Sequence, residues 1–230
     1  MNRKVVIEIN FNNYGMNPNR LTREWISERI AIFRRFTLRS LLAQTNQNFL
    51  AVAKLAGGCS DIVESELAKY EPLPENIRFG TSIESKRRIE AYIKDADELY
   101  IARLDSDDLY HKTFVQQLHD YRPKPETVAL INQLGYTWDA DNGEMAPMFH
   151  RCLSFYVFVY SAADYLAGER VVIPGKGTHG YVIELPHEVL PLRNYVNVIH
   201  SSNTSVKKVP PKDRLTPDEM NRVLAEFMGD

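Results

Sequence analysis

The regular alternation of short apolar strands with amphipathic helices in the first half of the chain limits its fold more than any other feature. Apolar, β-branched runs predict strands at residues 4–11, 49–55, 77–79 and 98–104. Helical periodicity predicts helices at residues 23–43, 60–70, 83–94 and 111–121. Because strands joined through helices pair in parallel, this order is typical of an α/β protein with a mostly parallel sheet flanked by helices.

The second half is less regular and ends in a further helix. Strands are expected at residues 128–134, 155–160 and 195–200, with a hairpin around Asp141-Asn142-Gly143. Thr216-Pro217-Asp218-Glu219 is a strong helix start, since it combines a threonine cap, a proline at the first helical position and a glutamate in the first turn. We therefore divide the chain into a single domain over residues 1–205 and a linker with a C-terminal helix over residues 206–230.

The composition gives no strong net electrostatic field. Lys and Arg number 28 against 30 Asp and Glu, so a net charge of −2 gives no reason to expect binding to nucleic acid or to an anionic membrane. No apolar run approaches the roughly 20 residues of a membrane span, and we expect a cytoplasmic protein. Cys59 and Cys152 fit no metal-binding spacing and are expected to be free thiols in a reducing compartment.

The segment most informative about function is the apolar strand that ends in Asp105-Ser106-Asp107-Asp108. In an open parallel sheet, ligands bind outside the carboxyl ends of the strands. Like charges packed this closely repel one another, and a divalent cation relieves the conflict. Such oxygen ligands suit Mg²⁺ or Mn²⁺ shared with the phosphates of a substrate. The alternative is a solvated turn that caps the helix beginning near Tyr110.

Several short motifs accompany this acidic cluster. They are Trp25, Arg29 and Phe33, then Leu38-Arg39-Ser40-Leu41, Gln44-Thr45 and Asn48-Phe49, the run 103–108, and His200-Ser201-Ser202-Asn203. Together they resemble the GT-A-fold glycosyltransferases, and within them the bacterial rhamnosyltransferase family, over residues 4–205. The resemblance implies a Rossmann-like GT-A fold and an enzyme that takes its sugar from a nucleoside-diphosphate donor.

The resemblance also implies where the donor binds. The expected contacts are Asn10, Asn12, Asp61, Arg87, Arg88, Asp105 and Ser106. The asparagine amides, together with that of Asn13, can read a pyrimidine edge, although they equally suit a turn. A guanidinium matches the oxygens of the diphosphate, and a solvated basic helix face is the alternative for both arginines. Asp105 is expected to face the ribose or the water shell of a metal.

The same resemblance assigns a metal site to Asp107 and His200, which would hold Mn²⁺ or Mg²⁺. An imidazole ligand favours Mn²⁺, and a purely structural histidine is the alternative. Asp108 is expected to cap the following helix or to hold a water molecule. The cation would neutralise the nucleoside diphosphate as it leaves.

A catalytic base should also remove the proton of the acceptor hydroxyl. The candidates are Asp139, Asp141, Asp164, His179 and Glu184. We favour His179, because it lies on a loop with a glycine close on either side, while a simple turn is the alternative. Asp105 is placed with His179 in the predicted catalytic set.

The sequence thus predicts a metal-dependent glycosyltransferase that moves rhamnose or another hexose from a dTDP- or UDP-linked donor to a hydroxyl of a glycan acceptor. A nucleotidyltransferase is one alternative, but it needs a glycine-rich, arginine-containing loop that residues 12–18 do not provide. A non-catalytic glycan-binding module is the other, and the presence of Asp105, Asp107 and His200 argues against it. The oligomeric state is left open.

Overall fold

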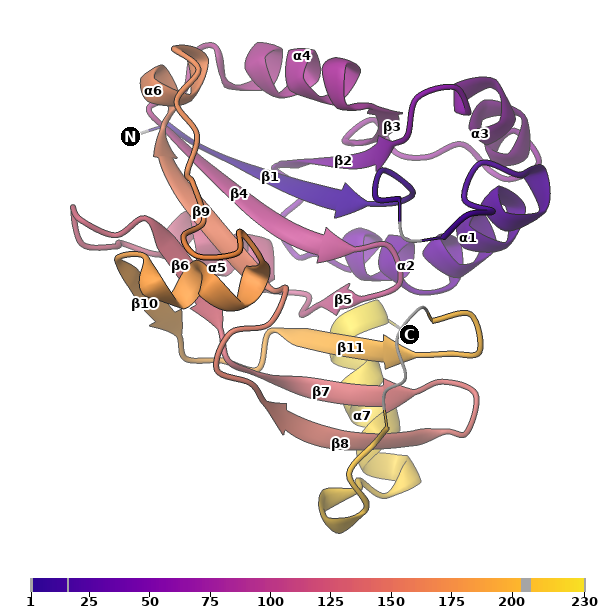
Figure 1. Cartoon of the computed structure of the whole chain (residues 1–230). Helices are drawn as coiled ribbons and strands as arrows, with labels where there is room; N and C mark the ends of the chain where they lie inside the picture. The colour runs from indigo at the N-terminus through magenta and orange to yellow at the C-terminus, as the bar shows by residue number, and fades with distance from the viewer. Residues whose placement is uncertain (1, 16, 204–207, 230) are drawn as a thin grey trace.

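A large β-sheet forms the centre of the molecule (Figure 1). The computed structural model describes residues 2–15, 17–203 and 208–229. Within these residues the sheet has seven strands in the order β10-β6-β9-β4-β1-β2-β3. They are β1 (Arg3–Asn10), β2 (Phe49–Leu55), β3 (Ile77–Thr81), β4 (Glu98–Asp105), β6 (Ala129–Asn132), β9 (Tyr156–Ser161) and β10 (His187–Leu190). Neighbouring strands are parallel except where β9 meets β4 and β6.

Helices cover both faces of this sheet. Side chains alternate along β1, so Val5 and Ile7 pack on one face and Val6 on the other. The first face is covered by α1 (Arg23–Arg35), α2 (Thr37–Leu42), α3 (Ser60–Leu67) and α5 (Phe114–Asp120), and the second by α4 (Ser82–Ile93) and α6 (Ala162–Leu166). The predicted α/β fold with a mostly parallel sheet flanked by helices is confirmed.

A smaller sheet and the C-terminal helix lie beside the carboxyl end of β4 (Figure 1). Its strand order is β5-β11-β7-β8, with β5 (Leu109–Tyr110), β7 (Leu134–Asp139), β8 (Glu144–Phe149) and β11 (Tyr195–Ile199). Helix α7 (Pro217–Met228) begins at the predicted capping box of Thr216 and Glu219. Its buried Phe227 joins an apolar cluster with Phe36 and Trp138. The proposed boundary at residue 205 lies outside the described residues.

The expected single helix over residues 23–43 is wrong, because the structure divides it at Phe36. The backbone of Phe36 leaves the helical region, with φ −117° and ψ −81°. Its ring packs edge-on against Trp138, with the ring centres 5.5 Å apart. The redirected helix α2 brings the hydroxyl of Thr37 to the carbonyl oxygen of Asp108 at 2.9 Å. These tertiary contacts override the local helical pattern.

Four short elements of the structure were not predicted from the sequence. They are β5, β10 and the 3₁₀-helices η1 (His179–Glu184) and η2 (Pro211–Asp213). A segment this short shows too few repeats for its periodicity to be recognised. Strand β5 nevertheless matters, because its antiparallel pairing with β11 joins the acidic turn after β4 to the smaller sheet.

Both cysteines are free, as the sequence predicts, and both are buried. The thiol of Cys59 accepts a hydrogen bond from the amide of Asn12 at 3.3 Å, and that of Cys152 donates to the carbonyl oxygen of His179 at 3.1 Å. Among the described residues, no helix combines the length and the apolar character that crossing a membrane requires.

We expect replacement of Phe227 by alanine to lower the free energy of unfolding by about 3–5 kcal/mol, because a buried aromatic side chain is removed from a packed cluster. Urea unfolding followed by circular dichroism measures the change. Asn221, which is exposed on the same helix, provides the control, and Asn221→Ala should change the stability by less than about 0.5 kcal/mol. Equal stability of the two variants would show that α7 does not stabilise the core.

Candidate functional site

A pocket opens at the carboxyl ends of β1 and β4. These strands pair with Asn10 opposite Asp105, so both residues end their strands at the same edge of the sheet. The pocket has a volume of about 350 Å³. The predicted site residues that line it are Asn10, Asn12, Asp105, Ser106, Asp107 and His179. The fold therefore gathers residues from three distant parts of the chain around one cavity.

Asp105 forms an ion pair with an arginine of its own strand. Nη2 of Arg103 lies 3.0 Å from Oδ1 of Asp105, and 34% of the Asp105 side chain is exposed. Arg103 also donates to the carbonyl oxygen of Ser154 at 3.2 Å. Its own carbonyl oxygen accepts a hydrogen bond from the hydroxyl of Tyr110 at 2.6 Å. These contacts orient a partly exposed carboxylate at the pocket wall.

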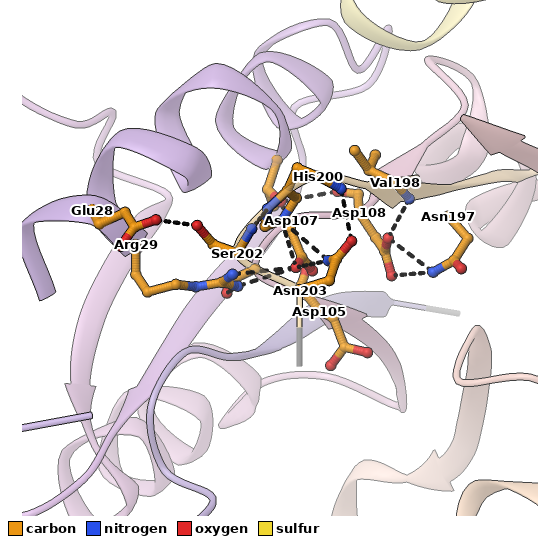
Figure 2. Close-up of polar contacts among 12 residues, drawn as sticks. Glu28, Arg29, Asp105, Asp107, Asp108, Asn197, Val198, His200, Ser202 and Asn203 are labelled. Carbon is orange, nitrogen blue, oxygen red and sulfur yellow. Dashed lines mark hydrogen bonds and ion pairs between the residues drawn. The ribbon is translucent and has the colours of Figure 1, made fainter. Parts of the chain in front are cut away.

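Asp107 receives donors from two separate parts of the chain (Figure 2). Its Oδ2 lies 3.3 Å from both Nη1 and Nη2 of Arg29 on α1. The same oxygen lies 3.1 Å from Nε2 of His200 and 3.3 Å from Nδ2 of Asn203, both of which follow β11. The carboxylate therefore links α1 to the turn after β11 directly beside the pocket.

His200 contacts Asp107 through Nε2 of its ring. Its Nδ1 accepts the backbone N–H of Ser202 at 3.2 Å, and its Nε2 lies 3.1 Å from Oδ2 of Asp107 and 3.2 Å from Nδ2 of Asn203. The ring stacks on Phe36 with 6.1 Å between the ring centres, and only 4% of the side chain is exposed. These contacts place His200 directly against Asp107, and its expected metal ligation stays a prediction.

Asp108 fastens the smaller sheet to the end of β4. It is 1% exposed, and its Oδ1 accepts the backbone N–H of Val198 at 2.9 Å and the side-chain amide of Asn197 at 3.1 Å. The expected capping role is wrong, because the N-cap position of α5 is occupied by Thr113. The third carboxylate is thus buried in contacts that build the fold.

Asn12, which was expected to contact the nucleotide-sugar donor, lines the pocket. The amide of Asn12 is engaged within the chain, since its Oδ1 accepts the N–H of Ala56 at 2.9 Å and its Nδ2 donates to the carbonyl oxygen of Arg20 at 3.0 Å. This arrangement favours the turn role over base recognition.

Three of the residues expected to bind the nucleotide-sugar donor do not line the pocket. Asp61 is exposed in the first turn of α3. Arg87 and Arg88 lie on α4, and Arg88 donates to the carbonyl oxygen of Phe79 at 2.6 Å. The structure does not bring these side chains to the acidic cluster.

His179 lies at the exposed rim of the pocket, at the start of η1. Partial burial lowers the pKa of its ring, and the positive charge of Arg103 lowers it further against the opposing effect of Asp105. The imidazole is therefore suited to accept a proton near neutral pH. The other base candidates, Asp139, Asp141, Asp164 and Glu184, do not line this pocket.

Sequence reasoning assigned no role in the site to Arg20, Arg29 or Asn203, although all three line the pocket. Arg29 does carry a recognisable signal, because it occupies a position within the apolar stripe of α1. A charged residue at such a position must find a polar partner in the interior. For Arg20 and Asn203, which lie in loops, the sequence offers no comparable periodic signal.

The described residues supply a limited set of metal ligands. No group of three or more His, Cys, Asp and Glu side chains forms a metal cluster among them. Asp107 can still fit a cation of the Mg²⁺ type, since such ions are commonly held by one or two carboxylates together with water and substrate phosphates. The chemistry of the site therefore fits a cation that binds with its substrate.

A protein-family model described as "Putative rhamnosyl transferase" matches residues 18–164, more than half of the chain. The chain belongs to this family. A comparison with curated proteins finds no match.

Solved structures share the fold. Residues 1–349 of TarS from S. aureus, in complex with UDP-GlcNAc, match with a TM-score of 0.50 and 15% identity over 99% of this chain and 71% of that one. The same fragment with UDP gives a TM-score of 0.45 and 14% identity, over 97% and 70% of the two chains. A cytidylyltransferase from Leptospira borgpetersenii serovar Hardjo-bovis matches with a TM-score of 0.42 and 12% identity, over 84% of this chain and 77% of that one. The similarity to the TarS fragment with UDP-GlcNAc and the order of the strands show that the fold is GT-A. As a member of the matched family, the protein is a glycosyltransferase.

Asp108→Ala should lower the free energy of unfolding by about 2–4 kcal/mol, because it leaves buried donors of β11 without an acceptor. Chemical denaturation of the full chain measures this loss. The exposed Asp61 provides a charge-matched control, and its alanine variant should remain within about 0.5 kcal/mol of the parent protein. A stable Asp108→Ala variant would contradict the fastening role.

Proposed function

We propose that this protein transfers a sugar from a nucleoside-diphosphate donor to a hydroxyl group of a glycan acceptor. The observation that carries the proposal is the pocket at the ends of β1 and β4, where Asp105, Ser106 and Asp107 lie together. Ligands of open parallel sheets bind at this edge. The family description names a rhamnosyl transferase, and the TarS fragment of similar fold was crystallised with UDP-GlcNAc.

Rhamnose or another hexose is the proposed sugar, carried by dTDP or UDP. Tyr14, Trp25 and Leu153 add apolar surface to the pocket beside its charged groups. A sugar ring has apolar C–H faces that pack on such surfaces, while its hydroxyl groups need polar partners. The mixed lining therefore supports a sugar attached to an anionic carrier.

A divalent cation, Mn²⁺ or Mg²⁺, is proposed to bind at Asp107 together with oxygens of the donor diphosphate. Arg29, His200 and Asn203 hold this carboxylate in one orientation. The bound cation would neutralise the charge that develops on the departing nucleoside diphosphate. In this proposal His200 is a positioning residue.

His179 is the proposed base that accepts the proton of the acceptor hydroxyl. It lies at the rim of the pocket, where an acceptor can approach from solvent. The charged and titratable groups that influence it are Arg103, Asp105 and His150. Because the pKa of His179 is lowered, its ring stays neutral and able to accept a proton at neutral pH.

Nucleotide binding provides the first test. We expect one of UDP, dTDP, GDP and CDP to raise the melting temperature by about 5–10 °C in Mn²⁺ at a concentration of about 100 Kd, because it binds only the folded state. The increase should shrink in EDTA and in Asp107→Asn, whereas the exposed control Asp95→Asn should retain it. Absence of any shift with all four nucleotides would reject the proposed donor.

The pH dependence of turnover tests the base. Protonation of His179 removes its acceptor lone pair, so activity should fall as pH decreases through its pKa, which lies below the ordinary value of about 6.5. His179→Ala should reduce kcat by about 10²–10⁴-fold and abolish this acidic limb. Release of the nucleoside diphosphate from UDP- and dTDP-sugars measures both effects. His119→Ala serves as the control, since His119 lies outside the pocket. An unchanged acidic limb in His179→Ala would exclude this base.

A further inference from the structure

Two arginines from the segment between β1 and the middle of α1 line the pocket. Arg20 precedes α1, and Arg29 lies within it, one turn after Trp25. Figure 2 shows Arg29 reaching from α1 towards the carboxylate of Asp107. Its Cζ lies 5.8 Å from the centre of the Trp25 ring, and its Nη2 lies 2.6 Å from Oγ of Ser106. The guanidinium is thus directed to the acidic cluster.

Unsatisfied donors and acceptors concentrate in this segment. Five buried side-chain N or O atoms lack a hydrogen-bond partner within the described part of the chain. Three of them are Oδ1 of Asn13, Nε of Arg20 and Nε of Arg29. Buried polar groups are normally hydrogen-bonded, so such a concentration beside one pocket points to a binding function.

A purely structural arginine looks different in this chain. Arg3 donates from Nε to Glu98 at 2.7 Å, and its Nη1 contacts three backbone carbonyl oxygens of residues 118–121 at 2.6–3.1 Å. The contacts of Arg29 with Asp107 are both 3.3 Å and converge on a single oxygen. Charge-assisted hydrogen bonds are usually 2.7–2.9 Å long. Arg29 therefore has bonding capacity that Arg3 has already used.

The charges of the pocket support the same conclusion. Asp108 is engaged by β11, and Asp105 is paired with Arg103. Arg29 meets Asp107 only at the long distances given above, and Arg20 forms no ion pair with a carboxylate in the described ranges. A multiply charged anion entering the pocket would thus meet the guanidinium of Arg20 and that of Arg29, whose ion pair with Asp107 is long.

We propose that Arg20 and Arg29 bind the diphosphate of the donor. This inference rests on the proposed function, because it assigns the diphosphate of that donor to its binding residues. It replaces the sequence-based expectation for Arg87 and Arg88, which do not line the pocket. A guanidinium presents several N–H groups in a planar fork that matches phosphate oxygens. On binding, Arg29 exchanges its long contacts with Asp107 for phosphate oxygens, and this leaves Asp107 available to the cation.

Calorimetric titration with inorganic pyrophosphate in EDTA tests the inference without a nucleotide base or a divalent cation. We expect Arg20→Gln and Arg29→Gln each to weaken pyrophosphate binding by about 10- to 100-fold, since each removes charge-assisted hydrogen bonds. Arg39 is exposed on α2 outside the pocket. Arg39→Gln removes the same charge and should bind as the parent protein does. Thermal melting of each variant confirms that it is folded.

Asp107→Asn separates phosphate binding from a purely structural role of Arg29. If Arg29 only positions Asp107, Arg29→Gln should leave pyrophosphate binding in EDTA unchanged, because no cation is present for Asp107 to hold. If Arg29 binds phosphate, Asp107→Asn should strengthen pyrophosphate binding in EDTA, because it removes a negative charge and a competitor for the guanidinium. Arg29→Lys retains the charge without the fork and should recover part of the affinity lost in Arg29→Gln.

The result is decisive for each proposal separately. Equal pyrophosphate affinity of the parent protein and Arg29→Gln, or no binding by the parent, would overturn the inference. A nucleotide-dependent thermal shift in the parent would leave the proposed donor intact in that case. Conversely, pyrophosphate binding that depends on both arginines, without any shift from the four nucleotides, would reject the proposed donor while the anion site stands.

Discussion

Three carboxylates within four residues share the end of β4 because different parts of the chain compensate each of them. Arg103 on the same strand pairs with Asp105. Arg29 on α1 and His200 after β11 contact Asp107. The side-chain amide of Asn197 and the backbone N–H of Val198 donate hydrogen bonds to Asp108. These partners offset the repulsion among the three carboxylates. The same contacts join the first helix, the central sheet and the smaller sheet.

The break at Phe36 supports this arrangement. The break separates α1 from α2, and α2 contacts the residues that follow β4. Thr37 then donates to the carbonyl oxygen of Asp108, and the hydroxyl of Ser40 donates to that of Tyr110 at 2.8 Å. The ring of Phe36 itself stacks on His200. The break in the helix at Phe36 thus brings contacts to both the acidic turn and the histidine that contacts Asp107.

The three acidic residues consequently have different functions despite their proximity. Asp108 is buried and structural, Asp105 is partly exposed and paired, and Asp107 is held by long contacts at the pocket. In the proposed function, Asp107 would pass from the guanidinium of Arg29 to a cation when a substrate brings its own negative charge. The separate partners explain how this chain accommodates three neighbouring carboxylates.

The sequence by itself determined the α/β class, most strands of the large sheet, the capped C-terminal helix and the acidic cluster at a strand end. These features are set by local periodicity, by capping residues and by adjacent positions in the chain. It also placed Asn10, Asp105 and Asp107 in the candidate site, because the parallel arrangement puts the ends of neighbouring strands at one edge. Tertiary structure alone decided the break at Phe36, the separate partners of the three aspartates and the exclusion of Arg87 and Arg88 from the pocket. Those outcomes depend on contacts between residues far apart in the sequence, such as Asp107 with His200 and Phe36 with His200, and no local pattern specifies which distant partner a side chain will meet.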